Sequence, residues 1–474
     1  MNDQGRYQRQ ENSFSHERRT QTFIAEVGGE HARLTSTLLK TGAAAAGVAE
    51  VWSDFHGSGG HERHWLLGNH EALIRTVNPD VTYDFLDPEF LREDLEGVVG
   101  RHDNSWVVAH ANDPAGAARA LEQLRDLRVR VLLTLAATGG VIVQRHPDPA
   151  SALERLDTLG QRRAIPAGSA DLGAVAAGMA LNEIILGGTS IGDDLDTPRT
   201  VGFYSLSRRR RIDMPGAATF EELIAELASP LERATFSGRR LKQVGAGALG
   251  NWTAIAVALD GRVAMDVIDG DQEVQPHNLN RQVLLVRGLG RRKAPVLTEE
   301  LESLDQEGSY AHVDRFVELS SDLEPLGGVD AVIMAPDNDA ARLLGADVAW
   351  RWAVPYGVGG TGVTGGQLVI QEPARACFRC ITRLTDEAAS QREPAGGNSC
   401  ARANNESIVA SNMVVAGLLV SELREALAGR RSRNLRFFGN GGGSGNRLGR
   451  MTSDPECSHL ADVASRTESC SLEV

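Results

Sequence analysis

A glycine-rich turn between an apolar strand and an apolar helix constrains the fold of this chain more than any other feature. The segment from Leu241 reads LKQVGAGALGNWTAIAVAL, with glycines at Gly245, Gly247 and Gly250, and a second apolar run, RVAMDVID, ends at Asp269. Such glycines let the backbone approach a phosphate chain at a helix amino terminus, and a carboxylate after the next strand suits ribose hydroxyls. The pattern predicts a Rossmann-like βαβ unit that binds a nucleotide, and it leaves NAD and ATP both open.

The same order of signals occurs in weaker form near the N-terminus. TFIAEVGGEHARLTSTLLKTGAAAAGVAEVWSDF has a strand, a partial glycine turn at Gly28 and Gly29, a helix and another strand. Two later motifs also pair in order, WVVAHANDPAGAAR with AVIMAPDNDAAR and TGGVIVQRHPDP with TGGQLVIQEPA, and an apolar helix ends each half. We therefore predict two homologous α/β domains at residues 1–215 and 216–474, the first of them degenerate. Two unrelated Rossmann-like domains are the alternative.

Composition and charge exclude several classes of protein. The 474 residues are 42% hydrophobic and include 51 glycines, which suits packed α/β layers. A net charge of -14 argues against a surface made for nucleic acid or anionic lipid. The sequence has no apolar run long enough to span a membrane, and its N-terminus is too polar for a secretory signal. We expect a cytoplasmic protein that binds neither nucleic acid nor membrane.

Polar and cationic residues follow the second strand closely. DGDQEVQPHNLNRQVLL and GLGRRKAPVLTEEL supply Asn278, Arg281, Gln282 and Lys293, and a later strand is followed by Asp337. Each residue alone would be explained by a solvated face or a helix cap. Together they suit a triphosphate and the charge that develops during phosphoryl chemistry, and NLNRQ has no evident role in a nicotinamide oxidoreductase.

The combination DxD…NLNRQ…GxxKA, followed by DN at Asp337, resembles the ThiF/MoeB superfamily, to which ubiquitin-activating enzymes belong. The resemblance is strong over residues 235–460 and weak over residues 5–200. It implies two tandem ThiF-type adenylation domains that form a pseudo-dimer within one chain, so that the protein could be a monomer. The second domain would bind ATP and Mg²⁺.

The resemblance also assigns roles to individual side chains. It places Asp269 on the ribose and Asp337 on Mg²⁺. Arg281 and Lys293 would contact the phosphates, and Asn278 and Gln282 would belong to the local hydrogen-bond network, beside the glycine turn of Gly245, Gly247 and Gly250.

The first residues of the chain carry a further match. GRYQRQ, from Gly5 to Gln10, resembles the RYxRQ segment with which members of this family begin. By that resemblance Arg9 reaches across the pseudo-dimer into the ATP site of the other half, as an arginine finger. The alternative is a basic residue in a frayed tail.

Four of the five cysteines resemble a structural zinc site. Cys377 and Cys380 form a CxxC pair, and Cys457 lies downstream. Family members often bind Zn²⁺ with two such pairs, so the resemblance implies Cys470 as the fourth ligand, with His459 or a site of three cysteines as the alternatives. Free thiols in a reducing compartment are the competing interpretation.

The fifth cysteine, Cys400, lies in the polar loop GGNSCARANNES before a long apolar helix. Compact activating enzymes resemble this chain in carrying a thioester cysteine at this place. A helix amino terminus or Arg402 would lower the pKa of the thiol and favour its reaction with an acyl adenylate. A structural or sulfur-relay thiol is the alternative.

The resemblance thus implies an activating enzyme for a ubiquitin-like protein. It would form the acyl adenylate, capture the acyl group on Cys400 and pass it to a conjugating enzyme, as in compact bacterial antiphage operons. The first rival is a sulfur-carrier adenylyltransferase of the ThiF/MoeB type without conjugation, and the second is a non-catalytic scaffold of the same fold. The fused layout argues against the first, and Arg281, Lys293 and Asp337 argue against the second.

Overall fold

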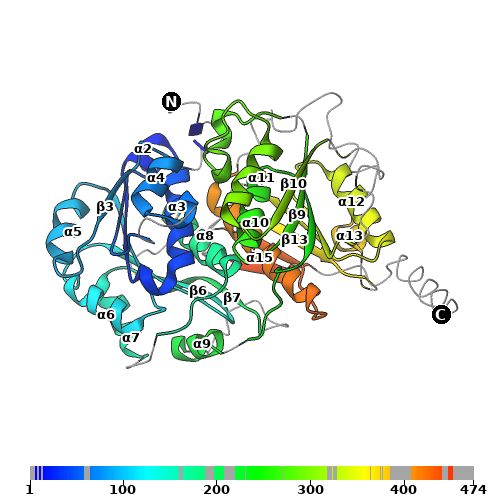
Figure 1. Cartoon of the computed structure of the whole chain (residues 1–474). Helices are drawn as coiled ribbons and strands as arrows, with labels where there is room; N and C mark the ends of the chain where they lie inside the picture. Colours follow the sequence, from blue (N-terminus) through cyan, green and yellow to red (C-terminus); the bar gives the residue numbers. More distant parts are fainter. Residues whose placement is uncertain are drawn as a thin grey trace.

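Two mixed β-sheets with helices on their faces make up the chain in a computed structural model (Figure 1). The described residues are 6–7, 10–11, 14–57, 64–159, 164–186, 197–207, 219–229, 231–270, 272–315, 317, 323, 328–362, 365–373, 375, 377–384, 407–439 and 447–451. We call residues 6–229 the first lobe and residues 231–451 the second lobe.

The first lobe carries a seven-stranded sheet of order β3-β2-β1-β4-β5-β6-β7. Its strands are β1 (Thr22–Val27), β2 (Glu50–Ser53), β3 (Thr82–Phe85), β4 (Asn104–His110), β5 (Arg130–Ala137), β6 (Gly140–His146) and β7 (Arg199–Ser205). The strands from β3 to β5 pair in parallel, and β6 and β7 are antiparallel. The helices are α2 (His16–Thr20), α3 (Arg33–Ala46), α4 (His70–Val77), α5 (Leu91–Val99), α6 (Pro114–Gln123), α7 (Pro149–Asp157), α8 (Ala170–Leu186) and α9 (Phe220–Leu227), with short 3₁₀ turns η1 (Gly29–Ala32) and η2 (Trp65–Leu67).

The second lobe repeats this order with one strand added, β10-β9-β8-β11-β12-β13-β14-β15. Its strands are β8 (Arg240–Val244), β9 (Ala264–Asp269), β10 (Ser309–Asp314), β11 (Ala331–Met334), β12 (Tyr356–Thr361), β13 (Gly365–Gln371), β14 (Leu435–Phe438) and β15 (Arg447–Arg450). Its helices are α10 (Ala248–Ala258), α11 (Lys293–Leu304), α12 (Asp339–Arg351), α13 (Phe378–Thr382) and α15 (Val409–Leu427), with 3₁₀ turns η3 (Pro276–Asn278) and η4 (Val283–Leu285).

The matching strand orders confirm the predicted α/β class and the tandem Rossmann-like layout. The sequence pairs fall on equivalent elements: WVVAHAND on β4 and AVIMAPDND on β11, then GVIVQRH on β6 and GGQLVIQ on β13. The two apolar helices at the ends of the halves are α8 and α15. These motifs form strands for the same reason in both lobes: parallel strands that are buried on both faces need continuous apolar runs.

The lobes meet through α8 and α15, which lie side by side at the centre of Figure 1. Every residue of α8 is buried, and one apolar core runs from α3 and α8 of the first lobe to α10 and α15 of the second. Small residues permit the close approach: a Cβ on Gly417 would lie 2.4 Å from the backbone oxygen of Asp171. Helices that are apolar on all sides must be covered by protein, so each lobe completes the core of the other.

Charged side chains also pair across the interface between the lobes. Asp171 on α8 pairs with Arg233 at 2.7 Å and lies 3.5 Å from the guanidinium of Arg424 on α15. Burial alone would raise the pKa of Asp171, but Arg233 and Arg424 hold it well below its ordinary value. Across the same interface, Tyr204 of β7 donates a 2.9 Å hydrogen bond to Glu422 of α15. The Asp171 carboxylate is therefore ionised and paired inside the protein.

The connection between the lobes includes α9, whose capping box at Thr219 starts the helix. Phe220, Ile224 and Leu227 of α9 pack in the core of the first lobe. The boundary between residues 215 and 216 stays a prediction, and the charged stretch at 208–218 lies outside the described residues. Within the part of the chain described here, no helix combines the length and apolarity that a membrane crossing requires.

Candidate nucleotide-binding site

The glycine turn between β8 and α10 has the conformation that its sequence predicts. Gly245 adopts a φ of +99°, and a Cβ there would lie 2.7 Å from the backbone oxygen of Ala335. A Cβ on Gly250 would lie 2.0 Å from the oxygen of Gly245, whereas one on Gly247 would meet nothing within 4 Å. Gly245 and Gly250 thus permit tight packing, and the space before α10 at Gly247 is open to a ligand.

Asp269, at the end of β9, lies beside this turn. Its Oδ2 accepts a 2.5 Å hydrogen bond from the backbone N–H of Ala246. Burial raises the pKa of the Asp269 carboxyl, Asp337 adds to the shift, and Lys293 opposes it. The predicted ribose ligand is therefore placed at the turn, in electrostatic contact with both a cation and a second carboxylate.

Lys293 is buried and forms the first residue of α11. Its Nζ donates to Oε1 of Gln272 at 2.9 Å, and its backbone N–H donates to the oxygen of Gln272 at 3.1 Å. The ammonium is thereby directed toward the loop after β9, on the side of Asp269. The structure brings together Gly245, Asp269 and Lys293, which are far apart in the sequence.

Two residues of α10 that sequence reasoning missed join the glycine turn to the NLNRQ segment. Asn251 donates to the oxygens of Ala246 and Gly247 at 2.9 and 3.1 Å and accepts from the N–H of Leu284 at 3.0 Å. Trp252 donates through Nε1 to the backbone oxygen of Arg281 at 3.1 Å. The sequence does carry a signal for this role, because Asn251 and Trp252 have polar groups within the otherwise apolar helix GALGNWTAIAVA.

The NLNRQ segment itself is buried and ordered by its own side chains. Asn278 caps η3 by accepting from the N–H of Gln275 at 2.8 Å. Nη1 of Arg281 donates to the oxygen of His277 at 3.0 Å and to Oδ1 of Asn280 at 2.8 Å. Among the described residues, the buried Oε1 of Gln282 has no hydrogen-bond partner. A buried acceptor without a protein partner can accept from a ligand that supplies a donor.

Asp337 lies three residues beyond β11 and is exposed. It directly precedes Asn338, whose side chain caps α12 by accepting from the N–H of Ala341 at 2.6 Å. Burial raises the pKa of Asp269, and the charge of Asp337 adds to that rise. An exposed carboxylate at the carboxyl ends of the strands fits a Mg²⁺ ligand, a role that stays a prediction.

The corresponding turn of the first lobe is organised differently. The N–H groups of Gly28 and Gly29 donate to Asp54 at 2.6 and 3.4 Å, in the manner of Ala246 and Asp269. Directly before this turn, however, Glu26 is fully buried and paired with Lys40 and, at 2.5 Å, with His110. The Lys40 ammonium is thus paired with Glu26 inside the lobe, so it cannot also neutralise a polyphosphate at this turn.

Several predicted site residues cannot be placed. Arg9, Cys400, Cys457, His459 and Cys470 lie outside the described residues.

Of the predicted zinc ligands, Cys377 is buried and precedes α13, and Cys380 is half-buried within that helix. The CxxC pair offers two soft ligands on one turn, which fits half of a tetrahedral zinc site. Within the described ranges no group of three or more potential metal ligands occurs.

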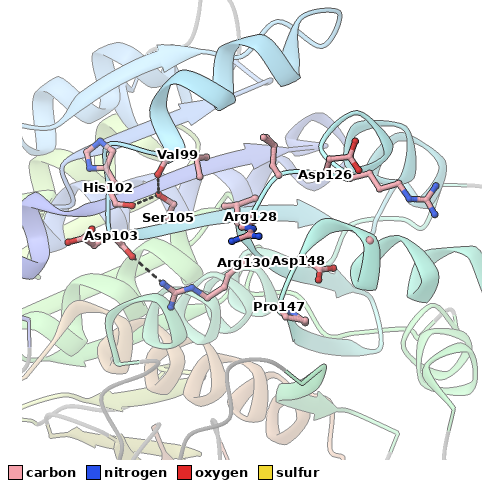
Figure 2. Close-up of a pocket in the computed structure, with 13 residues that line it drawn as sticks. Val99, His102, Asp103, Ser105, Asp126, Arg128, Arg130, Pro147 and Asp148 are labelled. Carbon is pink, nitrogen blue, oxygen red and sulfur yellow. Dashed lines mark hydrogen bonds between the residues drawn. The ribbon is translucent and has the colours of Figure 1, made fainter.

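A separate pocket of about 440 Å³ lies in the first lobe at the amino-terminal ends of β4 and β5 (Figure 2). Arg128, Arg130, Asp126 and Asp148 are among its lining residues, and Arg130 donates to the backbone oxygen of Asp103 at 3.4 Å. Acidic and basic side chains both line this pocket, so it favours neither anions nor cations. Its position at the opposite edge of the sheet from Asp54 separates it from the nucleotide-type turn.

Fold and site together define a two-lobed α/β protein with a Rossmann-like glycine turn in each lobe. Residues 232–458 match the ThiF family.

Two solved structures of the E. coli enzyme MccB resemble the chain at 17% identity and cover 47% of it and 67% of MccB. One holds N-formylated MccA, with a TM-score of 0.40, and the other holds ATP, with a TM-score of 0.39. PaaA resembles it at 18% identity with a TM-score of 0.38, covering 46% of this chain and 74% of PaaA.

Proposed function

We propose that the second lobe binds Mg-ATP and adenylates the C-terminal carboxylate of a ubiquitin-like protein. One observation carries this proposal: the open amino terminus of α10, Asp269 and the buried Lys293 converge at the carboxyl ends of the strands. The match of residues 232–458 to the ThiF family supports it. The orphaned Oε1 of Gln282 adds an acceptor for a nucleotide donor.

The chemistry needs charge neutralisation and positioning more than a general base, because the attacking carboxylate is already ionised. A carboxylate oxygen bonds to the α-phosphorus of ATP as the bond to pyrophosphate breaks. Lys293 and Arg281 offset the charge on the phosphates, and Asp269 accepts from the ribose. Mg²⁺, when bound at Asp337, would supply further positive charge to the phosphates.

The first lobe acts in this proposal as a degenerate domain that no longer binds nucleotide. The buried Glu26, with its partners Lys40 and His110, supports that role. Arg9 is the residue we expect to cross into the active site. Arg6 and Gln10, which are close to Arg9 in sequence, both contact the second lobe. Arg6 donates to the backbone oxygen of Leu279 at 3.4 Å, and Gln10 accepts from Asn280 at 3.5 Å.

Later steps follow from the sequence resemblance. Cys400 attacks the acyl adenylate, AMP leaves, and the resulting thioester is passed to a conjugating enzyme. Cys377, Cys380, Cys457 and Cys470 hold a structural zinc ion. The CxxC pair at α13 supports the zinc site.

The experiment is to incubate the purified chain with ATP, labelled pyrophosphate and candidate ubiquitin-like proteins. We expect ATP–pyrophosphate exchange and an adduct that a reducing agent releases. Cys400→Ala should keep the exchange and lose the adduct. Exchange without any adduct in the wild type would favour the sulfur-carrier adenylyltransferase, and no exchange with any carrier contradicts the proposal.

A further inference from the structure

Four side chains from the two lobes meet beside α11. Oε2 of Glu300, on α11, accepts from Nε1 of Trp65 at 2.7 Å and contacts Nε2 of His64 at 2.9 Å. The guanidinium carbon of Arg287 lies 5.8 Å from the centroid of the Trp65 ring. His64 and Trp65 belong to the first lobe, and Arg287 and Glu300 belong to the second. We call these four residues the α11 latch.

Hydrogen bonding fixes the protonation of the latch. The backbone N–H of Leu66 donates to Nδ1 of His64 at 3.1 Å, which leaves Nε2 of the ring to donate to Glu300. Burial would raise the pKa of Glu300, but the hydrogen bonds from His64 and Trp65 and the charge of Arg287 hold it below its ordinary value. Glu300 is therefore an ionised carboxylate with two donors, both from the other lobe.

The latch is built into the segment that carries the site. Glu300 follows Lys293 by seven residues, so two helical turns place both on one side of α11, roughly 10 Å apart along its axis. Arg287 lies between the NLNRQ segment and α11. A contact that fixes Arg287 and Glu300 thus fixes the path of the backbone from Gln282 to Lys293.

We propose that the first lobe positions Lys293 for phosphate chemistry by holding α11 through this latch, with His64 and Trp65 as positioning residues. The inference rests on the proposed function in one respect, that Lys293 meets the triphosphate. It gives the degenerate lobe a task besides Arg9, because a displacement of about 1 Å at a catalytic group can reduce a rate roughly 100-fold. The lobe that has lost its own nucleotide chemistry orders the site of the other.

Two conservative variants test the latch. Glu300→Gln weakens both hydrogen bonds, and Trp65→Phe removes the indole N–H while keeping an aromatic ring. We expect kcat for ATP–pyrophosphate exchange to fall about tenfold with KM for ATP changed less than about threefold, since mispositioning removes an interaction made in the transition state. Deuterium exchange of the amides at residues 293–304, measured on the protein alone, should become faster in both variants.

Glu50→Gln is the matched control. Glu50 contacts Nε2 of His102 at 2.8 Å and accepts from Nε1 of Trp52 at 3.3 Å, so it has the same pair of partners, but all three lie in the first lobe. This variant should leave both kcat and the α11 amides as in the wild type.

The outcomes separate the latch from the proposed function. Unchanged α11 amides and unchanged kcat in both Glu300→Gln and Trp65→Phe overturn the latch, and so does an equal effect of Glu50→Gln. A wild-type chain without exchange activity contradicts the proposed function, while the deuterium exchange still reports whether the first lobe holds α11.

Discussion

At the scale of single residues, a buried lysine is the most informative group in the second lobe. Removing an ammonium from water is costly, and here Gln272 and the nearby Asp269 offset that cost. The second lobe has another buried lysine, Lys242 on β8, whose Nζ donates to the backbone oxygen of Leu323 at 3.4 Å. Both lysines are buried, but Lys293 acts on the pKa of Asp269 at the glycine turn whereas Lys242 interacts with Asp266, which provides a comparison.

Lys293→Met should lower ATP–pyrophosphate exchange at least about 100-fold, because a preorganised charge at the phosphates is lost. Its thermal stability should change little, since Met fills the same volume without an ionised group to bury. Lys242→Met serves as the control and should retain exchange within about twofold. Equal losses in both variants would show that the effect on exchange arises from general destabilisation.

At the scale of elements, the packing of α8 against α15 depends on glycine. Gly417 lies on α15 where a Cβ would come within 2.4 Å of the Asp171 backbone oxygen and 2.8 Å of a Val175 methyl. Backbone cannot move aside as a flexible side chain can, so the helices must separate for any larger residue. The close approach of α8 and α15 therefore requires the absence of a side chain at this position.

Gly417→Ala should reduce the free energy of unfolding by roughly 1–3 kcal/mol, despite the higher helix propensity of alanine. Gly97→Ala on α5 is the control, since a Cβ there meets nothing within 4 Å. That change should be neutral or stabilising by up to about 1 kcal/mol. Chemical denaturation of the three proteins measures the difference, and a stable Gly417→Ala variant would contradict the close helix approach.

At the scale of the whole molecule, the two lobes form one folding unit. The apolar core includes residues of α3 and α8 together with residues of α10 and α15. Asp171 of the first lobe holds Arg233 and Arg424 across the same interface. Neither lobe can bury its apolar helix alone, so we expect one cooperative calorimetric transition for the intact chain.

Asp171→Asn should lower the free energy of unfolding at neutral pH by roughly 3–5 kcal/mol, because two arginines stay buried without their carboxylate. The pKa of Asp171 is lower in the folded chain than its ordinary value of 3.8. Its contribution is therefore complete above about pH 5 and is lost as the pH falls through and below 3.8, a loss absent from the variant. The exposed pair Glu71–Arg75 is the control, and Glu71→Gln should cost less than about 0.5 kcal/mol. Equal stability of Asp171→Asn and wild type at pH 7 would contradict the interface.

The sequence by itself determined the α/β class, the repeat and the glycine turn. These follow from local rules: apolar runs form buried strands, and Gly245 and Gly250 occupy positions where a Cβ would clash with backbone. The polar residues after β9 were also proposed as site residues from the sequence, a role that stays a prediction. Their spacing along the chain was enough to group them, because the βαβ unit brings strand ends to one edge.

Only the tertiary structure decided which groups meet. Asn251 and Trp252 fix the NLNRQ segment, and His64 and Trp65 reach Glu300 across more than two hundred residues of sequence. The contacts of Glu26 with Lys40 and His110 were also visible only in the structure. Hydrogen bonds and ion pairs of this kind depend on distance in space, which no pattern along one chain encodes, whereas strand and helix signals depend on neighbours that the sequence shows directly.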